Sequence, residues 1–227
     1  MKAFVFAAGK GTRMMPLTKE RQKCMLPING RPTVEHVLRA LPQNIDEIIL
    51  VVGYQKEEVQ NYFKQNFEGK KIRYVVLEEL RGTGQTLFSC KEHIGPEEKF
   101  LLVFGDNLYS AQALEQLSKE ELALLAIRHS QPENFGVALT DERGYLLQIE
   151  EKPERAKSNL VLCGAYLLNG KIFNYHLVKN EETREYFLTE LINQMKEDYS
   201  FKIVESNFWH PIGSAQDLVD AQQHING

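Results

Sequence analysis

The chain has 227 residues, of which 43% are hydrophobic and 26% charged, and its formal net charge is −4. The length suits one substantial domain, the composition is that of an ordinary soluble globular protein, and the negative charge argues against a nucleic-acid surface. No apolar run is long enough to span a membrane, and the first one is too short for a signal peptide. The three cysteines, Cys24, Cys90 and Cys163, form no CxxC pair, and the histidines lack zinc-ligand spacing. We therefore expect a reduced, cytoplasmic protein without structural zinc.

Strands and helices alternate in the first half of the chain, as a parallel α/β sheet requires. Apolar runs predict strands at residues 3–6, 47–52, 71–77 and 100–104. Helical spacing predicts helices at residues 33–41, with Thr33 as the N-cap, at 56–67 and at 86–93.

The second half changes character. Strands are predicted at residues 122–127, 161–168 and 201–205, a hairpin at 135–140 and 145–150, and helices at 171–178, 187–196 and 215–224. There is no internal repeat and no low-complexity linker. We expect an α/β fold, with a Rossmann-like mixed, mostly parallel sheet flanked by helices. It should form a single domain over residues 1–227, with a front half at 1–110 and a back half at 111–227.

A glycine-containing loop, residues 7–13 (Ala-Ala-Gly-Lys-Gly-Thr-Arg), directly follows the first predicted strand. Small residues leave backbone N–H groups free to face an anion, and Arg13 and Lys23 bring two cations to the same strand end. The glycine spacing does not fit a Walker A loop, and Met14 replaces the third glycine of a dinucleotide fingerprint. Glycines alone could merely shape a tight turn, but the combination predicts a polyphosphate site.

Further polar motifs follow other predicted strands, where ligands bind in open α/β sheets. Asp106 comes after the strand at 100–104 and could hold Mg²⁺ together with phosphate oxygens and water. Gly82 and Gly84 could let a flat base lie against the backbone. Lys152 could reach a second phosphate, and Glu151 could accept hydrogen bonds from sugar hydroxyls. An Asp at a strand end often only caps a helix, and surface Glu-Lys pairs are usually solvated, so the convergence of these motifs carries the prediction.

Two longer segments, residues 9–18 and 23–32, closely resemble the signature of sugar-1-phosphate nucleotidylyltransferases. The later motifs follow in the family's order, so the resemblance covers essentially the whole chain: Gly82-Thr83-Gly84, Gly105-Asp106-Asn107, Phe135-Gly136-Val137, Glu151-Lys152-Pro153, Gly164-Ala165-Tyr166 and Leu188-Thr189-Glu190. The resemblance implies Mg²⁺-dependent transfer of a nucleotidyl group from an NTP to a sugar 1-phosphate, giving an NDP-sugar and pyrophosphate. It implies no general base, because the attacking phosphate is already ionised. The length is that of the family's short, single-domain form.

The resemblance also implies a role for each matching residue. Arg13, Lys23 and Asp106 would be catalytic, and Asp106 would bind Mg²⁺. The nucleotide would be bound, in the half at 1–110, by Ala7, Ala8, Gly9, Gly11, Thr12, Arg13, Leu77, Gly82 and Thr83. The sugar phosphate would be bound by Gly136, Glu151, Lys152 and Gly164, in the half at 111–227.

Four departures from the family's pattern stand out, and one of them, Leu162-Cys163 in place of an Asn-Ala that precedes Gly164 in many relatives, concerns the sugar contacts. Pro211 stands where relatives commonly carry a second metal-binding Asp, so we expect Asp106 to hold Mg²⁺ with water and phosphate only; the alternative is a weak or inactive enzyme. Leu77 replaces a base-contacting glutamine of many uridylyl and thymidylyl enzymes, which leaves guanine, cytosine and adenine open. Gln22 replaces the usual proline before Lys23, a change expected to affect only the path of the loop.

Two other functions stay open from the sequence. One is a cytidylyltransferase acting on a non-sugar phosphate such as phosphocholine, for which Tyr166 or Trp209 could contribute to an aromatic cage. The other is a catalytically silent regulator that binds nucleotide sugars, which the missing second Asp favours.

Overall fold

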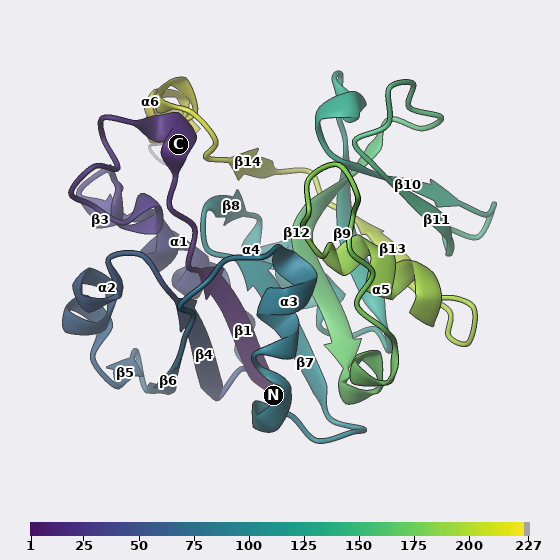
Figure 1. Ribbon diagram of the computed structural model, residues 1–227, viewed down its shortest axis with the longest axis horizontal. Coiled ribbons are helices and arrows are strands. Elements are labelled where there is room, and N and C mark those ends of the chain that lie inside the picture. The colour runs from purple at the N-terminus through teal and green to yellow at the C-terminus, as the bar shows by residue number, and fades with distance from the viewer. Residues whose placement is uncertain (225–227) are drawn as a thin grey trace.

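The computed structural model describes residues 1–224, and within them one sheet of ten strands runs through both halves of the chain (Figure 1). Its main path has the order β11-β10-β12-β7-β1-β4-β6-β5, with β9 beside β12 and β13 beside β9. The strands are β1 (Lys2–Ala7), β4 (Glu47–Val52), β5 (Asn66–Phe67), β6 (Lys70–Val76), β7 (Lys99–Phe104), β9 (Ala123–Arg128), β10 (Gly136–Thr140), β11 (Leu146–Glu151), β12 (Leu160–Asn169) and β13 (Lys202–Glu205). Two small ribbons pair β2 (Pro27–Ile28) with β3 (Arg31–Pro32) and β8 (Asn107–Tyr109) with β14 (Trp209–Pro211).

The centre of the sheet is parallel. Strand β1 pairs in parallel with β4 on one side and β7 on the other, and β4 pairs in parallel with β6. Most side chains of β1, β4 and β7 are buried on both faces, which explains why these strands are nearly continuous apolar runs. Strand β12 joins β7 in the antiparallel sense, so the sheet is mixed around a parallel core. This confirms the predicted fold class.

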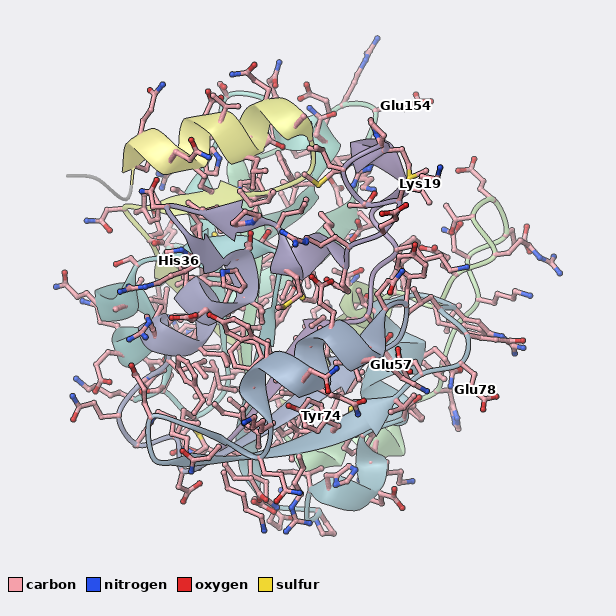
Figure 2. All side chains as sticks on the ribbon, turned by 90° about the vertical axis from the view of Figure 1, so that its left-hand side faces the viewer. Lys19, His36, Glu57, Tyr74, Glu78 and Glu154 are labelled. Atoms are coloured by element: carbon pink, nitrogen blue, oxygen red, sulfur yellow. The ribbon has the colours of Figure 1, made fainter. Side chains whose placement is uncertain are left out.

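Helices cover both faces of this sheet. One face packs against α1 (Thr33–Ala40), α2 (Lys56–Phe63) and α4 (Ala111–Leu117), and the other packs against α3 (Thr83–Phe88) and α5 (Leu188–Met195). The last helix, α6 (Ala215–His224), lies apart on a small cluster with Met14, Leu26 and Ile212. In Figure 1 it lies above β3 and α1. Figure 2 looks onto the β6 edge, where the hydroxyl of Tyr74 donates to the carbonyl of Lys64 just after α2.

The order of the strands in the sheet determines where the loops after β1 and β7 lie. From β1 the chain moves outward through β4 and β6 and then returns to β7 on the other side of β1. Ligand crevices of open α/β sheets form at such reversals. The loop after β1 therefore lies beside the turn after β7, where the N–H of Gly105 donates to the carbonyl of Phe6 at 2.9 Å.

The predicted strands are confirmed to within about two residues at their ends, which is the usual uncertainty of such boundaries. The predicted hairpin is also present, with β10 antiparallel to β11. Three helix predictions were wrong in extent. The helix at 56–67 ends at Phe63, because Lys64 has a φ of 54° and the chain turns into β5. The helix predicted at 86–93 begins at Thr83 and ends at Phe88, with a separate turn at Lys91–His93. At 171–178 there is only a short 3-10 helix, Gly170–Asn174.

Other local predictions failed as well. Thr33 is not the N-cap of α1, because Pro32 holds that position and the Thr33 hydroxyl donates to the carbonyl of Leu26 at 2.9 Å. The sequence reading also missed α4, β8 and β14. Strand β14 follows a polar segment and pairs with a strand about a hundred residues earlier, which no local pattern announces.

Candidate functional site

A cavity of about 990 Å³ opens at the carboxyl ends of β1 and β7 and extends to the back half of the chain. Many of the predicted site residues line it: Arg13, Lys23, Thr83, Asp106, Gly136, Glu151, Lys152 and Gly164. A neighbouring cavity of about 640 Å³ is lined by others, namely Gly11, Thr12 and Leu77, together with Lys10 and Tyr54. Of the predicted nucleotide-binding residues, Arg13 and Thr83 thus line one cavity and Gly11, Thr12 and Leu77 line the other, whereas Gly82 lines neither. Ala7 and Ala8 are buried beneath them, and Gly9 is exposed on the loop.

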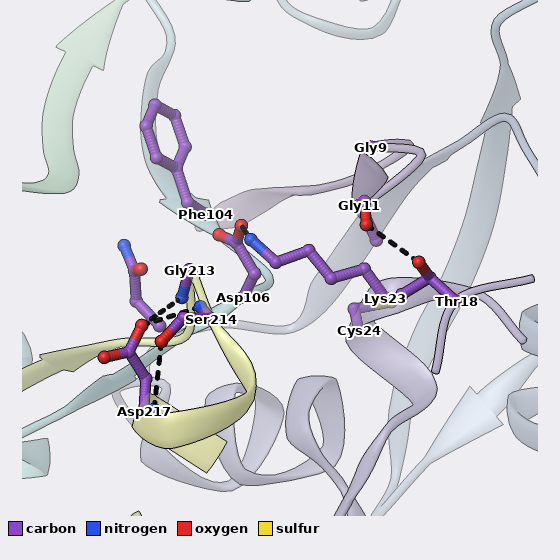
Figure 3. A network of polar contacts seen from close by, with 12 residues as sticks. Gly9, Gly11, Thr18, Lys23, Cys24, Phe104, Asp106, Gly213, Ser214 and Asp217 are labelled. Atoms are coloured by element: carbon purple, nitrogen blue, oxygen red, sulfur yellow. Dashed lines mark hydrogen bonds and ion pairs between the residues drawn. The ribbon is translucent and has the colours of Figure 1, made fainter. Parts of the chain in front are cut away.

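An ion pair lies on the front-half side of the larger cavity. Lys23 belongs to the 3-10 turn Lys23–Met25, and its side chain, 11% exposed, extends until Nζ lies 2.5 Å from Oδ2 of Asp106 (Figure 3). Gly11 makes room for this side chain: it has a φ of +63°, and a Cβ there would lie 2.9 Å from Cβ of Lys23. A glycine is therefore needed both for the backbone conformation and for the close approach.

A hydrogen-bond network around the buried Tyr109 hydroxyl restrains the turn that carries Asp106. The hydroxyl of Tyr109 accepts from the N–H of Phe104 at 3.1 Å and from the side-chain amide of Asn107 at 3.1 Å, and lies 3.0 Å from the carbonyl of Gly164. On the other side, the N–H of Ile212 donates to the carbonyl of Asp106 at 2.9 Å. These hydrogen bonds restrain the turn after β7 on both sides. The backbone that carries the Asp106 carboxylate is therefore held in place by contacts within the protein.

The back half contributes a half-buried carboxylate, that of Glu151. Oε2 of Glu151 accepts a hydrogen bond from the hydroxyl of Thr189 at 3.1 Å, and Glu151 lies opposite Gly136 in the β10–β11 pairing. Burial raises the pKa of Glu151, and the Thr189 hydrogen bond opposes this rise only partly. Lys152 follows with a φ of 44°, and its N–H donates to the carbonyl of Phe135 at 3.1 Å. A cation and a desolvated carboxylate therefore stand side by side at this end of the cavity.

Aromatic rings close the same end. Phe135 packs edge-to-face against His129 at 4.9 Å and against Trp209 at 5.2 Å between ring centroids. All three rings line the cavity, but the sequence reading proposed only Trp209. Tyr166, the other ring considered for a cage, is 4% exposed and packs near Phe104. The signal for His129 was its position beside a predicted strand end, and the signal for Phe135 was its place in the Phe135-Gly136-Val137 motif.

Gly82 and Gly84 have a packing role that the sequence reading missed. A Cβ on Gly82, whose φ is +99°, would lie 2.5 Å from the carbonyl oxygen of Tyr186. The N–H of Gly84 donates to that same carbonyl at 2.8 Å, and Thr83 Oγ1 accepts from the N–H of Leu188 at 2.9 Å. The turn therefore joins the front half to the start of α5.

Asp106 is the carboxylate best placed for a metal ion. Among residues 1–224, no three His, Cys, Asp or Glu side chains form a group that could hold a metal. Pro211 pairs with Asn107 in β14–β8, and Oδ2 of Asp217 accepts from the N–H groups of Gly213 and Ser214 at 2.8 and 2.7 Å, which caps α6. A single carboxylate at the edge of the cavity is still compatible with Mg²⁺, which commonly takes one or two carboxylates and completes its shell with phosphate oxygens and water.

No helix in the part of the chain that the structure describes is long and apolar enough to cross a bilayer.

Two curated relatives show how far the similarity extends. A bifunctional GlmU protein of Methanocaldococcus jannaschii is 34% identical over 99% of this chain, but only 54% of its own length is covered. The chain thus spans about half the length of the first curated relatives it matches. The UTP–glucose-1-phosphate uridylyltransferase AglF of Haloferax volcanii is 30% identical, and the match covers 99% of this chain and 96% of AglF.

Two solved structures have the same fold. A candidate glucose-1-phosphate thymidylyltransferase from Bacillus anthracis, solved with sucrose, has a TM-score of 0.87 and 28% identity, covering 99% of this chain and 94% of its own. A UDP-glucose pyrophosphorylase solved with UDP-glucose also has a TM-score of 0.87; its 23% identity supports the fold alone. The sequence pattern of the family described as nucleotidyl transferase matches residues 2–227. This match confirms the resemblance found from the motifs, and the chain belongs to the nucleotidyl transferase family.

Proposed function

We propose that this chain transfers a nucleotidyl group from an NTP to a sugar 1-phosphate, releasing pyrophosphate. The observation that carries the proposal is the Lys23–Asp106 ion pair, 2.5 Å long, in the cavity that also holds Arg13 from the front half and Lys152 and Glu151 from the back half. Three cations around one cavity suit two phosphate-bearing substrates, because each phosphate brings charge that must be neutralised.

The front half is proposed to bind the NTP. Its triphosphate would lie against the glycine loop, with Arg13 and Lys23 neutralising the charge on the phosphates and on the leaving pyrophosphate. The cavity lined by Gly11, Thr12 and Leu77 would take the base of such a nucleotide. Lys23 would exchange part of its contact with Asp106 for a phosphate oxygen when the NTP arrives.

The back half is proposed to present the acceptor. Lys152 would hold its phosphate, and Glu151, kept in place by Thr189, would accept hydrogen bonds from sugar hydroxyls. An oxygen of the acceptor phosphate would form a bond to the α-phosphorus as the bond from that phosphorus to the β-phosphate oxygen breaks. No proton is transferred, so the residues contribute mainly positioning and charge neutralisation.

Asp106 is the residue that would hold Mg²⁺, with phosphate oxygens and water as the other ligands. When bound, the ion would neutralise part of the triphosphate charge. All three cysteines are buried and unpaired, as is usual in a reducing compartment, and we place the reaction in the cytoplasm.

The test is a matrix of nucleotides against acceptors, scored by pyrophosphate release. It combines ATP, CTP, GTP, UTP and dTTP with several hexose and amino-sugar 1-phosphates, and adds phosphocholine as a non-sugar acceptor. We expect release only when an NTP and a sugar 1-phosphate are both present with Mg²⁺. Release with phosphocholine alone among the acceptors would favour the cytidylyltransferase. Tight nucleotide-sugar binding without turnover at any Mg²⁺ or Mn²⁺ level would favour the silent regulator.

A further inference from the structure

The side chain of Gln22 is buried beneath the glycine loop, with the residue only 1% exposed. Its Nε2 donates to the carbonyls of Ala7 at 2.5 Å and Gly9 at 3.2 Å, and its Oε1 accepts from the N–H of Cys24. The N–H of Gln22 donates to Oε2 of Glu58 on α2 at 2.8 Å. One amide therefore joins the end of β1, the glycine loop and the turn that carries Lys23.

These bonds determine the direction of two peptide groups. In a trans peptide the carbonyl oxygen and the N–H of the following residue point in opposite directions. Because the carbonyls of Ala7 and Gly9 point at Gln22, the N–H groups of Ala8 and Lys10 point away from it. A carbonyl turned outward on this loop would instead repel a phosphate, so the orientation of these two peptide groups matters for anion binding.

The same side chain also sets the position of Lys23. Gln22 is the N-cap of the 3-10 turn Lys23–Met25, and its Oε1 accepts from the second N–H of that turn. Lys23 then extends to Asp106. A proline at position 22 would offer no side-chain amide and no N–H for Glu58. We expected that Gln22, in place of the usual proline, affects only the path of the loop. Its hydrogen bonds show that it also contacts the end of β1 and α2.

We propose that Gln22 is a positioning residue for the NTP, which orients the glycine loop and Lys23 together so that both face the triphosphate. This inference rests on the proposed function for the identity of the ligand. Gln22 itself does not touch the nucleotide. Its effect should therefore fall on NTP affinity and leave the acceptor side, which is built by Glu151 and Thr189, unchanged.

The test compares Gln22→Met with a matched control, Gln194→Met. Gln194 makes the same kind of contacts far from the loop: its Nε2 donates to the carbonyls of His176 and Glu190, and its Oε1 accepts from the N–H of His176. Both variants lose one buried or half-buried amide with similar loss of hydrogen bonds. We expect Gln22→Met to raise both the calorimetric Kd and the KM for NTP by about 10- to 100-fold, since small misplacements of binding groups have effects of this size. The KM for the acceptor and all constants of Gln194→Met should stay within about twofold of the wild-type values.

A second variant, Gln22→Glu, separates the role in the loop from the role in the turn. Its carboxylate can still accept from the N–H of Cys24, but it has no donor for the carbonyls of Ala7 and Gly9. Its NTP affinity, taken as a ratio to wild type, should be low at about pH 8 and partly recover toward about pH 6, because a buried carboxyl is protonated easily and its O–H can then donate. If Gln22→Met does not fold, the NTP affinity of Gln22→Glu tests the proposed role of Gln22.

NTP binding within about twofold of wild type in folded Gln22→Met, or in Gln22→Glu at high pH, would overturn the inference, even if the melting temperature fell. Nucleotide binding is measured without acceptor, so it reads out the role of Gln22 whether or not pyrophosphate release occurs. Absent turnover in the wild-type protein would instead count against the proposed function.

Discussion

The two sides of the cavity hold their charged groups in opposite ways. On the front side, Lys23 and Asp106 neutralise each other at 2.5 Å, and Asp106 is held by a buried network around Tyr109. On the back side, Glu151 is half-buried with the Thr189 hydroxyl as its neutral hydrogen-bond partner, and desolvation raises its pKa. The front side is thus electrostatically satisfied before a ligand binds, whereas the back side retains a desolvation cost that donors on a bound acceptor would offset. The front side thus contains a preformed ion pair, whereas the back side contains a carboxylate whose side-chain hydrogen-bond partner is a neutral hydroxyl.

The largest effect should come from breaking the front ion pair. We expect Lys23→Met and Asp106→Asn each to lower kcat by about 100- to 1,000-fold, as does the loss of one preorganised electrostatic group elsewhere. The double variant should be hardly worse than either single variant, because the two residues act as a unit. Pyrophosphate release measured at saturating substrates checks this prediction.

A surface ion pair provides the control. Lys119 lies 3.5 Å from Glu115 with its side chain 67% exposed, so Lys119→Met should leave kcat unchanged. If the kcat of Lys23→Met equals that of Lys119→Met, the Lys23–Asp106 ion pair does not contribute to catalysis.

The next effect concerns the contact between the two halves. Gly82→Ala should lower the free energy of unfolding by about 2–4 kcal/mol, because it combines a strained positive φ with a clash against the Tyr186 backbone. Gly69→Ala is the matched control: Gly69 has a φ of +84° but open space around its Cβ position, so only the conformational strain of about 1 kcal/mol should remain. Urea denaturation measures both variants, and equal losses would mean that the approach of Tyr186 contributes nothing.

The smallest effect tests the half-buried carboxylate of the back half. Glu151→Gln should raise the KM for the acceptor about tenfold while leaving the KM for NTP unchanged, because a neutral acceptor forms weaker hydrogen bonds with hydroxyl groups. The same variant should melt at a higher temperature at neutral pH, since it removes a desolvated charge.

The pH dependence follows from the sign of the pKa shift. A raised pKa in the folded state means that Glu151 takes up its proton at a higher pH than an exposed glutamate. The KM for the acceptor should therefore rise as the pH falls through that raised pKa. The folded state also binds more protons in this window, so its stability should fall as the pH rises from the ordinary glutamate pKa through the raised one. Both trends should be absent in Glu151→Gln, and identical profiles for the two proteins would contradict the role given to this carboxylate.

The front half could be predicted well from the sequence because its signals are local. Buried parallel strands are continuous apolar runs, the loop with Gly11 and Arg13 follows the end of β1, and Asp106 follows the end of β7. The role of Gln22 could not be predicted, because it depends on a carbonyl that lies fifteen residues earlier in the chain.

The back half was harder because its site is built from distant segments. His129, Phe135 and Trp209 come together only through the arrangement of β9, β10 and β14, and α4 was missed entirely. In the front half, Gly82 was predicted to lie against a base, and its packing against Tyr186 of the back half could not be foreseen. The role of such a residue depends on its contacts with segments distant in the chain, and these contacts are not visible in the local sequence.

The proposed transfer is tested most directly by following the α-phosphate. The wild-type protein is incubated with each α-³²P-labelled nucleotide, Mg²⁺ and a sugar 1-phosphate, and the products are separated. For at least one pair, the account predicts label in an NDP-sugar in an amount equal to the pyrophosphate released, and no such product in Lys23→Met over the same time. Label that stays in the nucleotide, or appears as free NMP with every acceptor, would contradict it.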